Sequence, residues 1–428
     1  MPRAETMDPA KERTGTRPPN LMRRHADHSG ERGLTPASLR RANERTLIGL
    51  LTRFRRASRA ELAKASGMSQ PTAGKIIHRL LALGALREVN GNHRPGSPGG
   101  NGGREGGALR PGRPGRQIEF DPRTPRFLGV QLDVTETALA GLPFNPHCDE
   151  EWPVRFPTRP GLEEWIESLA ARSVVPHPQR LWGVMLSTPG IVDEAAGRVV
   201  FSPNLHWTER TDLRGAIEGV WKLPVVVVQE IRALALGHLM HEPDHRDFLL
   251  VDFGEGLGGA IVIQGRLFSN PLPLHGELGH TPIPGNPRRC GCGGVGCLET
   301  LLSRRSLLDG YAASGAPEPH DWDGFRRHVA AAGIPPWFDG ALAAAGSVIA
   351  GALNTLGLRR VVVTGLLNDM PAAVLGRLFE AIRQGGIWAR FGEIEFCAAS
   401  RRRASGLVAA GIDLVAEPHF GVGRKPAG

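Results

Sequence analysis

The spacing of apolar residues changes along the 428-residue chain and divides it into segments with different expected structures. Residues 1–36 show no sustained apolar period, and we expect them to form a disordered basic tail. A helical period then begins, with apolar residues at positions i, i+3, i+4 and i+7. These residues are Leu47, Leu50, Leu51 and Phe54. The first predicted element is therefore an amphipathic helix whose apolar stripe needs partners.

Two further helices are predicted directly after the first. Ser58-Arg-Ala-Glu61 has the pattern of a capping box and opens a short second helix, which ends in a tight turn at Gly67. Ser69 caps a third helix with Pro71 in its first turn. This pattern predicts a helix-turn-helix whose third helix would enter the major groove of DNA. Its DNA-facing residues would be Ser69, Gln70, Thr72, Lys75, His78 and Arg79.

A wing is expected after the third helix. Two β-like runs, residues 87–90 and 116–120, flank residues 91–116, which contain ten Gly and four Pro. We therefore predict a winged helix-turn-helix domain over residues 37–120 with a mobile Gly/Pro-rich insertion at 91–116. Arg113 and Arg116 would contact a minor groove or phosphates, or would belong to a solvated linker. A three-helix bundle that binds no DNA is the alternative for the whole segment.

The charge distribution supports a DNA partner for the first part of the chain. Residues 1–116 contain 23 Lys and Arg against 9 Asp and Glu, whereas the remainder contains 29 against 34. A basic segment joined to a mildly acidic body suits binding to a polyanion. Only five of the 52 basic residues are lysine, a bias that genome composition also produces, so the abundance of arginine is weak support by itself.

The remainder of the chain has the pattern of an α/β body. Short apolar β runs precede or follow helical segments at 298–313 and 337–356. The β runs are 127–133, 181–187, 225–228, 248–253 and 361–363. Turns rich in small residues follow several of these runs, and in α/β folds such turns usually hold ligands.

A metal-binding pattern lies between these elements. Three of the five cysteines follow a Cys-x-Cys-x4-Cys spacing with glycines between them, and a histidine lies ten positions upstream. Thiolate and imidazole groups in a closed tetrahedron are typical of structural zinc, which would brace a loop and activate no water. Glu277 and Glu299 flank these residues and are candidates to face a substrate or effector. The alternative is a glycine-rich loop with incidental thiols.

These motifs together resemble the ROK family of repressors, open reading frames and sugar kinases, and in particular its repressors of the xylose and N-acetylglucosamine type. The resemblance rests on the metal pattern and on the segments Ser187-Thr-Pro-Gly-Ile-Val-Asp193, Ser202-Pro-Asn-Leu205 and His275-Gly-Glu-Leu-Gly-His280. It implies a two-lobed, actin-like (ribonuclease H-like) sugar kinase body over residues 125–420, with a zinc knuckle at 280–297.

The resemblance also implies the residues of two sites. Structural Zn²⁺ would be held by His280, Cys290, Cys292 and Cys297. A sugar would lie against Asn204, Gln229, Glu230, Glu277, His280 and Glu299. Converging carboxylates and amides are what sugar hydroxyls require, and a metal-braced loop would hold the acids in register.

The sequence departs from the kinase pattern of that family at several positions. The first phosphate turn, Asp-x-Gly-x-Thr in the kinases, is Asp133-Val-Thr-Glu-Thr137 here, so its glycine is missing and Glu136 is expected to repel phosphate. The Asn-Asp pair that supplies the base aligns with Gln229-Glu230, which moves the carboxylate by one methylene. The expected Gly-Gly is Gly365-Leu366, and the remaining Gly254-x-Gly256-x-Gly258 is weak support for nucleotide binding.

We therefore expect a transcriptional regulator and no enzyme: a repressor of carbohydrate genes whose former kinase cleft senses a sugar or sugar derivative. The alternatives are an ATP-dependent sugar kinase that keeps a DNA-binding head, and a repressor without ligand response. A homodimer or higher oligomer on double-stranded operator DNA is implied by the family and by the two-fold symmetry of helix-turn-helix operators.

The cellular compartment follows from what the sequence lacks. There is no run of eighteen apolar residues, and the first thirty residues lack the apolar core of a signal peptide. These features predict a cytoplasmic protein that binds no membrane. With three cysteines assigned to metal, no disulfide framework is indicated, and Cys148 and Cys397 are expected to be ordinary buried thiols.

Overall fold

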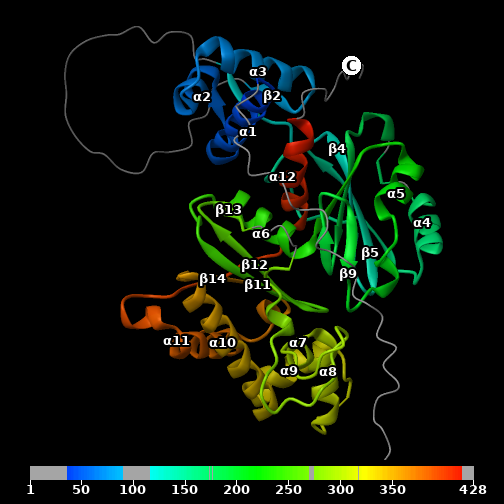
Figure 1. Ribbon diagram of the computed structural model, residues 1–428, viewed down its shortest axis with the longest axis vertical. Helices are drawn as coiled ribbons and strands as arrows, with labels where there is room; N and C mark the ends of the chain where they lie inside the picture. Colours follow the sequence, from blue (N-terminus) through cyan, green and yellow to red (C-terminus); the bar gives the residue numbers. More distant parts are fainter. Residues whose placement is uncertain are drawn as a thin grey trace, which may run out of the picture. The chain divides into compact units, whose positions relative to one another are not determined.

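The computed structural model describes residues 36–89, 116–172, 174–175, 177–268, 274–316 and 318–416 (Figure 1). Residues 1–35 of the expected tail, Arg113 and most of the wing insertion lie outside the described residues, so those predictions stay untested, whereas Pro36, expected in the tail, begins a helix. The described chain forms a small N-terminal unit of three helices and a three-stranded sheet, followed by a body with two five-stranded sheets.

The N-terminal unit has its helices at the predicted positions, and their caps explain where they begin. Its elements are α1 (Pro36–Phe54), β1 (Ala57–Ser58), α2 (Arg59–Ser66), α3 (Gln70–Ala82), β2 (Leu86–Val89) and β3 (Gln117–Phe120). The predicted capping box is confirmed, because the Ser58 hydroxyl accepts from the Glu61 amide at 3.2 Å and Glu61 accepts from the Ser58 amide at 2.7 Å. Gly67 ends α2 in the left-handed region.

The apolar face of α1 differs from the prediction at its last residue. Leu47, Ile48 and Leu51 are buried, but Phe54 is 42% exposed. Phe54 is the last residue of α1, and Arg55 leaves the helix with a φ of 62°. The chain therefore turns toward β1 before the Phe54 side chain reaches the core of the unit.

The first sheet of the body has the strand order β10-β7-β4-β5-β6, with β4, β7 and β10 parallel. Helices α4 and α5 cover one face through Trp165, Leu169 and Ile217, whereas α12 packs on the other through Leu407 and Val408. The elements are β4 (Pro125–Leu132), β5 (Glu136–Pro143), β6 (Val154–Pro157), α4 (Leu162–Ala170), β7 (Gly183–Thr188), α5 (Leu213–Trp221), β10 (Val225–Gln229) and α12 (Arg403–Val415), with the hairpin β8 (Ile191–Asp193) and β9 (Arg198–Phe201).

The second sheet has the order β13-β12-β11-β14-β15. One face packs on α7 to α11 and the other on α6, so helices cover both faces. The strands are β11 (Phe248–Phe253), β12 (Leu257–Ile263), β13 (Arg266–Leu267), β14 (Arg360–Gly365) and β15 (Glu395–Ala398). The helices are α6 (Glu230–His241), α7 (Glu299–Leu302), α8 (Arg304–Ala313), α9 (Trp322–Ala332), α10 (Pro336–Leu356) and α11 (Ala372–Gly385).

Two helical predictions need comment. The segment 298–313 is not one helix, because Ser303 has extended dihedral angles, ends α7 and caps α8 through its hydroxyl. Among the described helices, α10 is long and apolar enough to cross a membrane by length and composition. Its Phe338, Leu342 and Ile349 are nevertheless buried in the core beside the second sheet, as in a helix of a globular domain.

Helices α6 and α12 approach each other backbone to backbone. A Cβ added at Gly406 of α12 would lie 1.8 Å from the Ala233 carbonyl oxygen, and one at Gly237 of α6 would lie 1.9 Å from that of Arg402. No side chain larger than hydrogen fits at either contact. The far end of α12 meets the N-terminal unit, where Asp413 pairs with Arg45 at 2.6 Å. Helix α12 thus extends from α6 to α1.

Candidate ligand cleft and metal cluster

A pocket in the body collects side chains from the ends of β4, β10 and β11 and from the β11–β12 turn. Parallel strands place their carboxyl ends at one edge of a sheet, where α/β folds hold ligands. All six residues predicted to contact a sugar line this pocket, although they are far apart in sequence. They are Asn204, Gln229, Glu230, Glu277, His280 and Glu299. The structure brings them together; their binding of a sugar stays a prediction.

Gln229 has an unused hydrogen-bond acceptor in this pocket. It is the last residue of β10, is 4% exposed, and its Oε1 has no partner among the described residues. A buried acceptor without a donor costs about 1–3 kcal/mol. A ligand hydroxyl in the pocket would supply the missing donor, and this is the clearest local sign of a polar ligand.

Three further acidic and basic groups line the pocket, and one of them, Glu277, is hydrogen-bonded to the Gln229 side chain. Glu277 precedes the short 3₁₀ helix η4 (Leu278–His280), and His280 Nε2 lies 3.9 Å from its carboxylate. Burial raises the pKa of Glu277 and nearby Glu299 adds to the rise, whereas His280 opposes it. Glu299 begins α7 and accepts from the Leu257 amide at 3.0 Å, which fixes its carboxylate in the wall. The wall therefore offers rigid acceptors to sugar hydroxyls.

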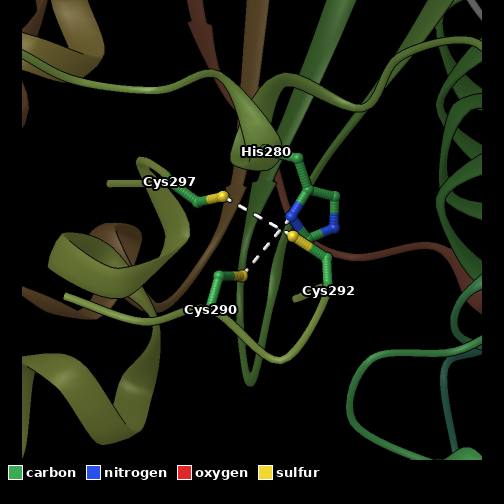
Figure 2. A group of neighbouring side chains, drawn as sticks. All are labelled: His280, Cys290, Cys292 and Cys297. Atoms are coloured by element: carbon green, nitrogen blue, oxygen red, sulfur yellow. Dashed lines mark hydrogen bonds between the residues drawn. The ribbon is translucent and has the colours of Figure 1, made fainter. Parts of the chain in front are cut away.

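The four predicted metal ligands form a compact cluster (Figure 2). Their ligand atoms all lie within 4.8 Å of one another. Cys292 Sγ and Cys297 Sγ are 3.6 Å apart, and Cys290 Sγ is 3.6 Å from His280 Nδ1. Bond lengths of about 2.3 Å to sulfur and 2.0–2.1 Å to nitrogen place two sulfurs about 3.8 Å apart, and sulfur and nitrogen about 3.6 Å apart, in a tetrahedron. The donor set and its spacing fit zinc.

The orientation of His280 joins this cluster to the pocket. Its Nδ1 faces the thiols and its Nε2 faces Glu277, so one ring belongs to both sites. A metal on Nδ1 would keep the proton on Nε2, where it can be donated toward Glu277 or a ligand. Burial raises the pKa of Cys290 to about 12, so without a cation this thiol stays protonated at neutral pH.

Two arginines in the pocket were missed by the sequence analysis. Arg403 donates from Nε to Glu230 at 2.8 Å and also from Nη2 to the same oxygen. Arg401 donates from Nε and Nη2 to the two oxygens of Asp252, at 2.7 and 2.8 Å. Burial opposes ionisation of Asp252, but the pair with Arg401 outweighs it and lowers the pKa of that carboxyl. The run Arg401-Arg-Arg403 was the only signal available.

Asp133 is a further acid that lines the pocket. It follows β4 directly, and its Oδ1 accepts from the Val134 amide at 2.7 Å. Burial raises its pKa to about 6, and the nearby Glu230 adds to the rise, whereas Arg403 opposes it. The carboxyl is therefore poised to change protonation near neutral pH.

Two residues expected to hinder phosphate and nucleotide binding lie outside this pocket. Glu136 does not line the pocket; it pairs with Arg155 of β6 at 2.6 Å, because the first residue of β5 lies opposite that strand. Leu366 is 7% exposed and begins the 3₁₀ helix η5 (Leu366–Asp369), packed into the core. It does not line the pocket either, and the predicted crowding of a nucleotide by its side chain stays a prediction.

The residues predicted to face DNA divide into two groups. Ser69, Gln70, Lys75 and His78 are exposed on α3, and Thr72 is half-buried with its hydroxyl bonded to Ser69 at 2.8 Å. Arg79 is turned inward, where it donates to Glu44 at 2.8 Å and to the Val415 carbonyl at 3.1 Å. Arg116 pairs with Glu88 at the base of the hairpin. The inward position of Arg79 disagrees with its predicted contact to DNA.

The family follows from a comparison of the whole body with known proteins. Residues 136–413, which include the metal cluster and all of the pocket lining except Asp133 and Val134, match the ROK family. The chain belongs to the ROK family. A putative xylose repressor of Caldicellulosiruptor sp. (strain Rt8B.4) is 27% identical over 280 residues, which cover 64% of this chain and 66% of the relative. The matched part of this chain thus spans just under two thirds of the length of that curated relative.

Solved ROK structures agree with the fold. A ROK family transcriptional regulator, a homologue of the Escherichia coli MLC protein, matches with a TM-score of 0.66 and 20% identity over 88% of this chain and 97% of its own. A ROK glucokinase from Streptomyces griseus, in complex with glucose and AMPPNP, matches with a TM-score of 0.54 and 23% identity over 67% and 98%. These identities establish the shared ROK fold only.

Proposed function

We propose that this ROK protein is a DNA-binding transcriptional repressor of carbohydrate genes, and that a sugar in the body pocket is its effector. One observation carries the proposal: the carboxylate at the kinase base position, Glu230, is held in an ion pair by Arg403 within a ROK body that is joined to a helical N-terminal unit. Repressor relatives such as the putative xylose repressor support the same assignment.

The N-terminal unit would be a winged helix-turn-helix. Helix α3 would lie in the major groove with Gln70, Lys75 and His78 toward base edges and phosphates. Ser69 caps the helix and, with Thr72, would contact the backbone near its N-terminus. The hairpin of β2 and β3 would be the wing, with Arg116 at its base. Two such units in a homodimer would read two half-sites of one operator.

The pocket would bind an uncharged sugar or sugar derivative. Gln229 offers an unpaired acceptor, and Glu277, Glu299 and Asn204 add polar groups at fixed positions. Both arginines of the pocket are already paired with acids, so they offer little to a phosphate group. Sugar occupancy would favour one arrangement of the body and so shift the equilibrium between DNA-binding and non-binding states.

A zinc ion held by His280, Cys290, Cys292 and Cys297 would be structural. Four protein ligands close the coordination shell, so the ion would brace the segment between Glu277 and Glu299 and supply no reactive water. His280 would then hold its proton on Nε2 toward Glu277, which orders the wall of the sugar pocket.

The experiment that tests the proposal is operator binding at fixed salt with and without sugars. Purified full-length protein is titrated with its own upstream DNA in the presence of xylose, glucose, N-acetylglucosamine and their phosphates. We expect specific binding that one unphosphorylated sugar shifts by at least fivefold. Absence of specific binding, together with ATP-dependent phosphorylation of a sugar that Glu230→Gln abolishes, would establish a kinase instead.

A further inference from the structure

A second group of metal-ligating side chains lies outside the pocket, at the carboxyl end of α6. His238 is in the last turn of that helix, His245 lies in the loop that follows, and Cys397 is on β15. One nitrogen of each histidine and the Cys397 sulfur all lie within 4.8 Å of one another. Cys397, expected to be an ordinary buried thiol, is thus only half-buried and faces two imidazoles.

We propose that His238, His245 and Cys397 bind a second transition-metal ion, of which zinc is the first candidate. Two imidazoles and one thiolate form a borderline-soft donor set that suits zinc and excludes magnesium or calcium, which require oxygen ligands. With three protein ligands, the fourth position is left to water or a small anion.

The spacing of the two imidazoles is close to that of a shared ion. His238 Nε2 and His245 Nδ1 are 3.1 Å apart. Two nitrogens bound to one zinc at about 2.0–2.1 Å in a tetrahedron are separated by about 3.3–3.4 Å. A hydrogen bond between two neutral rings has the same spacing, so the distance alone does not decide between them. The sulfur beside both nitrogens distinguishes this cluster from an isolated histidine pair.

The surroundings hold the three side chains in place. His238 is 3% exposed and packs edge-on against Phe248, with ring centroids 5.0 Å apart. The backbone amide of His245 donates to the Glu242 carbonyl at 2.9 Å and closes the loop that carries this histidine. Cys397 is fixed by the parallel pairing of β15 with β14. Little rearrangement is needed to place an ion between them.

The charges around the cluster are mixed. Arg360 and Arg402 are near enough to act on His238 and would disfavour a cation. Arg360 is paired with Glu395, however, and the carboxylate of Glu242 also acts on Cys397. A Cys397 thiolate would add a further negative charge at the ion itself. The local balance therefore permits a divalent ion once the thiol has lost its proton.

The position of the cluster suggests what the ion would do. It would tie the carboxyl end of α6 to the edge strand of the second sheet and fix the loop 242–247. That loop carries Asp244, which pairs with Arg53 of α1 at 3.1 Å. Exposed pairs of this kind contribute little by themselves, so the ion would act by ordering the loop that presents Asp244.

The test is the zinc content of the purified full-length protein by mass spectrometry, after dialysis against zinc and removal of loosely bound ion. We expect two equivalents per chain, and one in His245→Ala, in Cys397→Ala and in Cys292→Ser. The matched control is His241→Gln, on the same helix, whose ring bonds to Ser405 and not to the cluster; it should keep two. These variants avoid the fully buried His238, whose removal could prevent folding.

Two results would overturn the proposal. One is a single equivalent in the wild type that Cys292→Ser removes completely. The other is a second equivalent that persists in both His245→Ala and Cys397→Ala with unchanged affinity for zinc against a chromophoric chelator. Neither readout depends on DNA or sugar binding, so the fate of this inference is separate from that of the proposed function.

Discussion

Glu230 and Gln229 are neighbours in the chain but have opposite hydrogen-bonding states. Glu230 is bound by Arg403, whereas the buried Gln229 side-chain oxygen has no partner within the described part of the chain. The first residue is committed to an internal cation, and the second is available to a ligand. Under the proposed function, this difference favours Gln229 over Glu230 as the acceptor for a sugar hydroxyl.

Replacing Gln229 should therefore separate ligand binding from stability. We expect Gln229→Leu to weaken binding of the responsive sugar by about 1–3 kcal/mol, because a donor of the sugar loses its acceptor. The free energy of unfolding without sugar should change by less, because removal of an unpaired buried acceptor offsets the loss of the hydrogen bond between the Gln229 side chain and Glu277. Calorimetric titration and chemical denaturation measure the two quantities. Equal losses in both would show that Gln229 is only structural.

Asp133 should make stability depend on pH. Its pKa is raised to about 6 in the folded protein from an ordinary value of 3.8. The folded state therefore binds more protons than the unfolded state between these values, and stability falls as the pH rises through that window. We expect Asp133→Asn to abolish this loss. The unfolding free energy of the variant, relative to that of the wild type, should therefore be about 1–3 kcal/mol higher at pH 7 than at pH 4. Parallel curves would contradict the raised pKa.

The sequence indicated part of the site but not all of it. The knuckle was visible because its ligands lie within eighteen positions of one another and use distinctive residue types. Arg401 and Arg403 were not, since about 170 residues separate Arg403 from its partner Glu230. The position of Arg79 on its helix predicted an outward side chain. Its acceptor, the Val415 carbonyl of α12, is likewise distant in sequence and could not be predicted.

At the scale of elements, local signals located the N-terminal helices well. Ser58, Gly67 and Ser69 act through hydrogen bonds within three or four residues, so their effects are readable from sequence. The break at Ser303 was missed because apolar residues continue through it. The close contact of α6 and α12 was also hidden, because a glycine in a helix does not say which backbone approaches it.

The glycine contact gives an element-scale prediction. In Gly406→Ala the new methyl would lie 1.8 Å from the Ala233 carbonyl oxygen, so α6 and α12 must separate. We expect a loss of about 1–3 kcal/mol or more in the free energy of unfolding. Gly376→Ala in α11 is the matched control, since nothing lies within 4 Å of its Cβ, and it should stabilise by about 0.5–1 kcal/mol. Thermal denaturation measures both variants, and equal changes in their free energies of unfolding would refute the close contact.

At the scale of the whole molecule, α12 connects the pocket to the N-terminal unit. Arg403 at its first residue holds Glu230, and the carbonyl of Val415 at its last residue accepts from Arg79 of α3. A sugar that disturbs the Glu230 pair therefore acts on a helix whose other end contacts the proposed recognition helix. Under the proposed function, α12 would give coupling between the two sites a contiguous structural route.

Two substitutions on α3 should separate DNA contact from coupling. Lys75→Ala should weaken operator binding by about 1–3 kcal/mol equally with and without the responsive sugar. Arg79→Ala should instead reduce the ratio between the two affinities, because it breaks the link to Val415. Operator titrations at fixed salt measure both. If Arg79→Ala lowers both affinities equally and leaves their ratio unchanged, Arg79 acts on DNA binding or folding alone.

The pairing of Arg401 and Arg403 with Asp252 and Glu230 also bears on how the cleft can evolve. Under the proposed function, restoring an aspartate at position 230 would not recreate a catalyst, because Arg403 would still hold the carboxylate. Phosphoryl transfer would require changes at this arginine, at the base and in the phosphate turn together. A variant with only one of these changes would gain no catalytic activity. If the proposed function holds, single substitutions could change which sugar is sensed, but no single substitution would give an enzyme.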